Sequence, residues 1–205
     1  MQKERQIHWD SVYETKQPGE VSWTQEKPKT SLDLIQYLNL DKKAKIIDIG
    51  GGDSKLADHL LDEGYENITV LDISAKALEK AKRRLGKRAE KIKWIVSDIT
   101  DFEPTTTYDL WHDRATFHFL TNNAEIKKYI DIVHRSVSGF LVIATFSDNG
   151  PQKCSGLTIK QYNEDQLVKQ FISDFDKLRC FREDHITPFN TLQNFQFCSF
   201  NRRSK

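Results

Sequence analysis

The sequence predicts an α/β fold built on a doubly wound parallel sheet, and three observations indicate it. Segments with strand-like and helix-like patterns alternate from residue 45 to residue 146, which is the order expected for a parallel sheet covered by helices. Three consecutive glycines separate the first apolar run from the helix after it. Acidic residues stand at or beside the ends of three successive apolar runs. We therefore expect a ligand site at the carboxyl edge of the sheet.

The first strand and its turn are the stretch KIIDIGGGDS. Residues 46–49 form an apolar run that carries Asp48. Three glycines follow it: Gly50, Gly51 and Gly52. Glycine lets the backbone approach a ligand closely, and the segment at 54–61 has the leucine spacing of a helix. The dinucleotide fingerprint G-x-G-x-x-G would require glycine at position 55, where the chain has Lys55.

Two further apolar runs end near acids. Residues 68–73 contain Asp72, and a carboxylate at the end of that strand can accept both ribose hydroxyls of an adenosine. Residues 92–96 are followed by Ser97 and Asp98. Three acids at three strand ends form a more specific pattern than the glycines alone.

The turn led by Asp48 resembles motif I of class I S-adenosylmethionine (SAM) methyltransferases, written (D/E)-x-G-x-G-x-(G/S). The likeness to small bacterial members of that class covers nearly the whole chain, through HWDSVY, EVSW, IIDIGGGDS, DIS, SDI, YDLWHDRATFHFL, ATFSDNGPQKCSGL and REDHITPF. The stretch GGGDSKLADHLLDEGYENITVLDIS is more distantly similar to methyltransferase-like protein-lysine methyltransferases of eukaryotes. The resemblance implies a Rossmann-like class I fold, with a seven-stranded, mostly parallel sheet, helices on both faces and an antiparallel last strand.

The same resemblance implies SAM as cofactor and S-adenosylhomocysteine as its product. It places Asp48 near the aminocarboxypropyl end, Asp72 at the ribose and Asp98 at the adenine amino group. The implied cofactor-binding residues are Asp48, Gly50, Gly51, Gly52, Ser54, Asp72, Ile73, Asp98 and Ile99.

Residues 108–112 (YDLWH) are expected to form the fourth strand, with candidate catalytic residues at and just after its end. Asp113 is the first candidate for orienting or deprotonating an acceptor, and its alternative role is to cap the following turn. His112 is the second catalytic candidate, although a packed polar role is also open to it. Arg114 could clamp an anionic acceptor or simply pair with Asp113.

The chain is expected to form one methyltransferase domain, residues 1–205. Residues 1–40 would be an N-terminal lid or extension, 41–146 the SAM-binding half, and 147–205 a substrate-side loop and closing hairpin. Trp9, Tyr13 and Trp23 either fasten the extension to the sheet or, as the resemblance implies, line the pocket under a lid. Cys154 is either a packing residue of the loop or a transient methyl carrier, with Lys153 beside it favouring the thiolate.

Composition excludes several classes of protein. The 205 residues are 38% hydrophobic and 30% charged with a net charge of +1, so no overall field attracts nucleic acid or an acidic membrane. The basic stretch at 80–93 is expected to be a solvated helix face, with RNA binding as the alternative. Three cysteines without a C-x-x-C pair argue against a disulfide framework, with Cys180 and Cys198 expected in the core, and favour a cytoplasmic protein. No metal-ligand spacing, signal peptide or membrane-spanning run is visible.

We expect a small-molecule acceptor, because the chain has no added recognition domain. A protein-lysine methyltransferase is the rival enzyme, and a SAM-binding scaffold or sensor is the non-enzymatic alternative. A nicotinamide oxidoreductase is disfavoured by Lys55. The sequence does not decide whether the acceptor atom is sulfur, selenium, nitrogen or oxygen. It also leaves two oligomeric states, monomer and homodimer.

Overall fold

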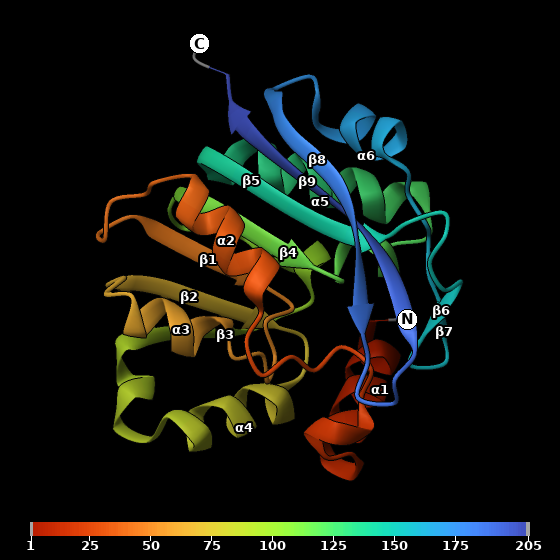
Figure 1. The fold of residues 1–205 in the computed structure, drawn as a ribbon. Helices are drawn as coiled ribbons and strands as arrows, with labels where there is room; N and C mark the ends of the chain where they lie inside the picture. The colour runs from red at the N-terminus through yellow and green to blue at the C-terminus, as the bar shows by residue number, and fades with distance from the viewer. Residues whose placement is uncertain (1, 204–205) are drawn as a thin grey trace.

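The computed structural model describes residues 2–203, in which seven strands form one sheet (Figure 1). These are β1 (Lys45–Ile49), β2 (Asn67–Asp72), β3 (Ile92–Val96), β4 (Tyr108–Arg114), β5 (Val137–Phe146), β8 (Phe175–Ile186) and β9 (Leu192–Arg202). Their order is β3-β2-β1-β4-β5-β9-β8. The first five strands pair in parallel, and β9 is antiparallel to both of its neighbours. The predicted sheet is therefore confirmed.

Six helices accompany the sheet: α1 (Gln2–Thr15), α2 (Lys29–Tyr37), α3 (Leu56–Asp62), α4 (Ala75–Leu85), α5 (Asn123–Ser136) and α6 (Glu164–Phe171). Short 3₁₀ turns are η1 (Pro18–Glu20), η2 (Gly86–Lys91), η3 (Ile99–Asp101) and η4 (Phe117–Phe119), and β6 (Lys153–Cys154) pairs with β7 (Leu157–Thr158) in a small hairpin. Two apolar cores result, one packed with α2, α3 and α4 and the other with α5 and α6. None of the helices in this described part of the chain combines the length and apolar character needed to cross a bilayer.

Three of the helices begin at a side-chain cap. Ser74 Oγ accepts the backbone N–H of Ala77 at the start of α4, and the side chain of Asn122 accepts that of Glu125 at the start of α5. Asn163 forms a reciprocal capping box at the start of α6. These contacts satisfy backbone donors that a helix leaves free at its first turn.

The fourth strand is longer than predicted, because β4 runs to Arg114. Asp113 and Arg114 therefore lie within the strand together with His112, and not beyond it. Side chains alternate between the two faces of a strand, so Asp113 lies on the face opposite to the other two. The strand order reverses between β1 and β4, and this switch point is where α/β sheets bind ligands.

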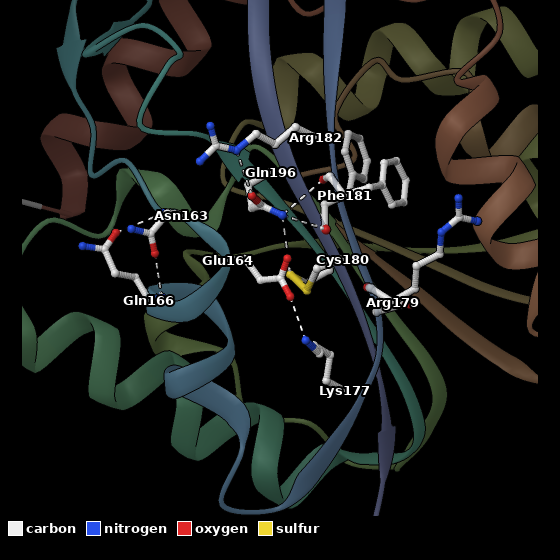
Figure 2. The surroundings of a disulfide bond; sticks show 12 residues. Asn163, Glu164, Gln166, Lys177, Arg179, Cys180, Phe181, Arg182 and Gln196 are labelled. Atoms are coloured by element: carbon white, nitrogen blue, oxygen red, sulfur yellow. Dashed lines mark hydrogen bonds and ion pairs between the residues drawn. A yellow bond between two sulfur atoms is a disulfide. The ribbon is translucent and has the colours of Figure 1, made fainter.

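The argument against a disulfide was wrong, whereas the expected core position is confirmed for Cys198, against which the partly buried Cys180 packs. Cys180 of β8 and Cys198 of β9 lie directly opposite each other, with Cα atoms 4.2 Å apart, and form a disulfide (Figure 2). The pairing arises from the antiparallel register of two strands that are joined by a hairpin, which cysteine counting does not show. Cys154 is buried and free.

Candidate active site

A cavity of about 540 Å³ lies at the carboxyl edge of the sheet, between the strand ends and the N-terminal segment. This volume falls within the roughly 300–1,000 Å³ range of small-molecule sites. Fourteen of the sixteen predicted site residues line it: Trp9, Tyr13, Trp23, Asp48, Gly50, Gly51, Ser54, Asp72, Ile73, Asp98, Ile99, His112, Arg114 and Cys154. Gly52 flanks the cavity, and Asp113 lies outside it.

The turn after β1 requires glycine at two positions by its geometry. Gly50 and Gly52 have φ values of +64° and +46°, a region that side chains disfavour. A Cβ at Gly50 would lie 1.8 Å from Thr116 Oγ1, and one at Gly52 would lie 2.8 Å from the Tyr13 hydroxyl. Gly50 N–H also donates to the carbonyl of Leu71 (2.7 Å), which joins the turn to β2. The bare backbone thus forms part of the cavity floor.

Ser54 and Arg84 hold the far side of this turn. Ser54 Oγ accepts the backbone N–H of Leu56 (3.1 Å) at the start of α3. Arg84 donates to the carbonyl of Ser54 (2.9 Å) and forms ion pairs with Asp53 and Asp58. This part of the basic stretch at 80–93 therefore has a local structural role.

Asp72 is a buried carboxylate at the end of β2 with unused acceptor capacity. Its Oδ1 accepts the backbone N–H of Ser74 (2.7 Å), and no basic side chain within residues 2–203 forms an ion pair with it. Burial raises the pKa of Asp72 to about 7, against the hydrogen bond from Ser74, and the negative charges of Asp48 and Asp10 add to the rise. A ligand hydroxyl that donates to Asp72 would stabilise its ionised form.

Asp98 has one oxygen that accepts hydrogen bonds and one that is ion-paired with Arg5. Its Oδ1 accepts both the backbone N–H and the hydroxyl of Thr100 (2.9 and 2.8 Å). Its Oδ2 is buried and accepts no hydrogen bond within the described chain, although Arg5 Nη2 lies 3.0 Å away. The same Arg5 nitrogen donates to Glu125 (2.8 Å), so α1 is tied across the end of β3.

Helix α1 covers the edge of the sheet, and its helical form was not anticipated. Asp10 Oδ1 accepts the Ser74 hydroxyl (2.6 Å) and lies 3.3 Å from the Lys76 backbone nitrogen, which donates to it at the start of α4. Lys80 Nζ donates to the carbonyl of Lys16 (2.8 Å). These contacts join polar groups of distant segments. The residues of α1 lack the apolar stripe by which a helix is predicted from sequence, so no local signal could have revealed it.

Four aromatic rings form one wall of the cavity. Trp9 packs edge-on against Trp23 and Phe119, with ring centroids 5.7 and 5.1 Å apart, and Tyr13 lies 6.2 Å from Trp23. Trp9, Tyr13 and Trp23 were predicted as one group, and in the structure their rings lie next to one another. Phe119 was missed because it follows β4, far from the other three in sequence.

His112 is the centre of a buried hydrogen-bonded chain. Its Nδ1 lies 2.7 Å from Asp48 Oδ1, and its Nε2 lies 2.9 Å from the Ser31 hydroxyl. A carboxylate can only accept, so Nδ1 carries the proton and Nε2 accepts from Ser31 when His112 is neutral. All three residues line the cavity. Nothing local in the sequence pointed to the contact between Ser31 and His112.

Asp113 does not have the geometry expected of a group that orients an acceptor. It is fully buried, its Oδ2 accepts the Tyr129 hydroxyl (2.6 Å), and its Oδ1 accepts the backbone N–H groups of Thr116 and Phe117 (2.9 and 3.2 Å). Burial raises the pKa of Asp113 to about 6, against these hydrogen bonds. The turn-capping alternative describes this residue, because strand alternation turns it away from the cavity.

Arg114 and Cys154 border the aromatic side. Arg114 forms no ion pair with Asp113, which removes the simpler of its two predicted roles, and its Nη1 donates to the carbonyl of Trp23 (3.4 Å). Burial raises the pKa of the Cys154 thiol to about 12, although Arg114 acts in the opposite direction. The thiolate that a methyl carrier would need is therefore disfavoured, and the buried Cys154 side chain packs in the core that contains α2, α3 and α4. Within residues 2–203 no cluster of three or more histidine, cysteine or acidic side chains could hold a metal ion.

Comparison with known proteins agrees with this geometry. A family model described as "Methyltransferase domain" matches residues 46–138, somewhat less than half of the chain. The chain is 28% identical to mouse eEF1A lysine and N-terminal methyltransferase over 58% of its length, and 27% identical to zebrafish (Danio rerio) EEF1A lysine methyltransferase 2 over 93% of its length. It is 37% identical over 50% of its length to malonyl-[acyl-carrier protein] O-methyltransferase of Anoxybacillus flavithermus. The aligned part spans 17%, 79% and 39% of these three relatives.

Solved structures show the same fold. One is the Burkholderia thailandensis 1,6-didemethyltoxoflavin-N1-methyltransferase with bound 1,6-didemethyltoxoflavin and S-adenosylhomocysteine. It superposes with a TM-score of 0.75 and 18% identity, and covers 98% of this chain and 89% of its own. A SAM-dependent methyltransferase from Anabaena variabilis gives a TM-score of 0.77 at 13% identity, over 98% of this chain and 95% of its own.

Proposed function

We propose, on the premise that the chain is a class I SAM-dependent methyltransferase, that it transfers a methyl group from SAM to a small-molecule acceptor by in-line displacement. One observation carries this proposal. A single cavity holds the glycine turn and the three strand-end acids, and it continues to an aromatic wall beside His112. Such a cavity can hold a nucleoside cofactor and a small acceptor together.

The residues present suit SAM. Asp98 Oδ2 is buried and ion-paired with Arg5 but accepts no hydrogen bond within the described chain, so it would accept the adenine amino group. Asp72 has no ion-pair partner in the described chain and would accept the ribose hydroxyls. Gly50 and Gly51 line the cavity and leave room for the amino-acid end of the cofactor beside Asp48. SAM, when bound, supplies an electrophilic methyl group on a sulfonium. The protein contributes alignment and a partly dry site.

We assign His112 the role of proton acceptor where the acceptor must lose a proton. Its Nε2 faces the Ser31 hydroxyl, and both side chains line the cavity. A proton can reach Nε2 directly or through Ser31, and the Asp48 carboxylate, 2.7 Å from Nδ1, stabilises the resulting imidazolium. Asp113 takes no part in this step, because its side chain lies on the other face of β4.

The N-terminal segment is assigned the role of lid. Residues 1–40 include α1, which is held at Asp98 through Arg5 and at the start of α4 through Asp10. Both contacts lie beside the proposed adenosine site, so cofactor entry requires α1 to move. Trp9 and Tyr13 would then close over the cofactor and exclude water.

A protein-lysine acceptor is the second candidate. It is supported by the 27% identity to EEF1A lysine methyltransferase 2 over 93% of the chain. The small-molecule acceptor is favoured by the position of α1 and by the aromatic wall, which border the cavity. We also predict that the protein has no nucleic-acid partner, that it is cytoplasmic, and that it is a monomer or homodimer. Cell fractionation would test the location, and size-exclusion chromatography would test the oligomeric state.

Two measurements test the proposal. Calorimetry should detect tight binding of S-adenosylhomocysteine to the wild type and to Arg182→Gln, an exposed control, and binding weaker by about 100-fold or more to Asp72→Asn. Methyl-labelled SAM, added with the enzyme to a size-fractionated cell extract, should label small metabolites. Label confined to macromolecules would favour the lysine candidate, and binding without any transfer would support the scaffold or sensor.

A further inference from the structure

Arg114 is a cation in the cavity wall without an anionic partner. It lines the cavity at the end of β4, and within residues 2–203 no carboxylate forms an ion pair with it. Its protein contacts are one long hydrogen bond to the Trp23 carbonyl (3.4 Å) and the face of the Phe195 ring, 4.7 Å from the guanidinium carbon. A guanidinium has five N–H donors, so most of its donors stay available to a ligand.

The groups around Arg114 do not neutralise it. The pKa of His118 is lowered to about 3 by burial and by the charge of Arg114, and the pKa of His185 is lowered for the same two reasons. Cys154 is a neutral thiol, because burial raises its pKa to about 12. The charges of Glu183 and Asp48 favour the protonated form of Arg114, but Glu183 accepts a hydrogen bond from Thr30, and within residues 2–203 neither acid forms an ion pair with the guanidinium. The buried guanidinium therefore has no anion in direct contact.

Such an arrangement costs stability unless a ligand supplies the missing charge. Burial lowers the pKa of Arg114 to about 10, which still leaves it protonated at neutral pH. A buried charge without a partner is expensive, and a bidentate carboxylate or related oxyanion is the partner that best fits a guanidinium. The aromatic rings of Trp9, Trp23 and Phe119 border the same space and would pack against an apolar body.

We propose that the acceptor is a small molecule with an apolar or aromatic body and an anionic group, which Arg114 binds. This inference rests on the proposed function and names the class of its acceptor. Strand alternation puts Arg114 and His112 on the same face of β4, two residues apart, so the anchored molecule would present its nucleophilic atom toward His112. A lysine ammonium would be repelled by the same guanidinium, which disfavours the second candidate.

The test uses matched probes that differ in charge alone. Wild-type protein saturated with S-adenosylhomocysteine would be titrated by calorimetry with benzoate and benzamide, indole-3-acetate and indole-3-acetamide, and benzenesulfonate and benzenesulfonamide. We expect at least one anion to bind about tenfold or more tightly than its neutral partner. Equal binding of both members of every pair, or no binding by any of the anions, would overturn the inference.

Variants assign the effect to Arg114. Arg114→Gln should remove the preference for the anion. Arg114→Lys should keep a weaker preference, because lysine retains the positive charge but lacks the paired N–H donors of a guanidinium. The control Arg182→Gln should keep the full preference. Thermal melting and S-adenosylhomocysteine affinity monitor folding, and the wild-type comparison stands if Arg114→Gln does not fold. Failure of the wild-type protein to bind S-adenosylhomocysteine would refute the proposed function. Intact cofactor binding with an unchanged preference in Arg114→Gln would refute only the role of Arg114.

Discussion

Replacing Asp72 by asparagine should weaken cofactor binding and stabilise the protein at the same time. The pKa of Asp72 is raised from 3.8 to about 7, chiefly by burial. At pH 8 the folded protein therefore holds an ionised carboxylate at a cost of about 4 kcal/mol, from a shift of roughly three pKa units at 1.36 kcal/mol each. Asparagine has nearly the same shape and no charge. The largest stability gain expected of Asp72→Asn at pH 8 is thus about 4 kcal/mol.

The sign of the pH dependence follows from proton binding. Between pH 4 and pH 7 the folded state holds a proton on Asp72 that the unfolded state has lost, so wild-type stability falls as pH rises through this window and levels off above it. The variant lacks this group and should show a correspondingly flatter profile. Urea unfolding at pH 5, 6, 7 and 8 would measure both curves.

Cofactor affinity should change in the opposite direction. Two hydroxyl donors to an ionised carboxylate are worth roughly 1.5–3 kcal/mol each, so Asp72→Asn should weaken S-adenosylhomocysteine binding by about 100-fold or more. Wild-type affinity should also fall below pH 7 as Asp72 becomes protonated. Unchanged affinity in the variant, or parallel stability profiles of the two proteins, would refute the assignment.

Three further results are expected. Gly52→Ala should lose S-adenosylhomocysteine binding, because residue 52 has a φ of +46° and the added Cβ would lie 2.8 Å from the Tyr13 hydroxyl. The control Gly64→Ala has a φ of +86° and no atom within 4 Å of the added Cβ, so it should lose only about 1 kcal/mol of stability and bind normally. Equal affinities of the two variants by calorimetry would contradict this prediction. Tyr129→Phe should lower the free energy of unfolding by urea by about 2–4 kcal/mol without changing cofactor affinity, since Asp113 and the Trp111 indole N–H lose the hydroxyl that they share. Loss of activity with unchanged stability would instead support a catalytic role for Asp113. Reduction of Cys180–Cys198 should lower the free energy of unfolding by about 3 kcal/mol, the value for a loop near this 18-residue separation, and identical melting with and without dithiothreitol would show that the bond contributes nothing.

The glycine turn, the acids at the strand ends and the helix caps could all be predicted, because each depends on residues that are neighbours in the chain. The turn needs glycine where φ is positive, at Gly50 and Gly52. The caps at Ser74, Asn122 and Asn163 need a short polar side chain within three residues of a free backbone donor. Such local requirements are written directly into the sequence.

The role of each residue on β4 could not be predicted from the sequence, because it depends on where the strand ends. In a strand with period two, Asp113 leaves the cavity and His112 and Arg114 enter it. An irregular turn at this point would have allowed the opposite assignment. The length of the strand is set by pairing with β1 and β5, which local pattern does not contain.

The sequence by itself determined the alternation of strands and helices from residue 45 to residue 146, the glycine turn, and the acids near the ends of three strands. Only the tertiary structure decided that α1 covers the site, that Ser31 meets His112 across 81 residues, and that Cys180 faces Cys198. The physical reason is the range of the interactions. Periodicity and turn chemistry act over a few residues, whereas these contacts form only once the sheet has fixed the register of distant segments.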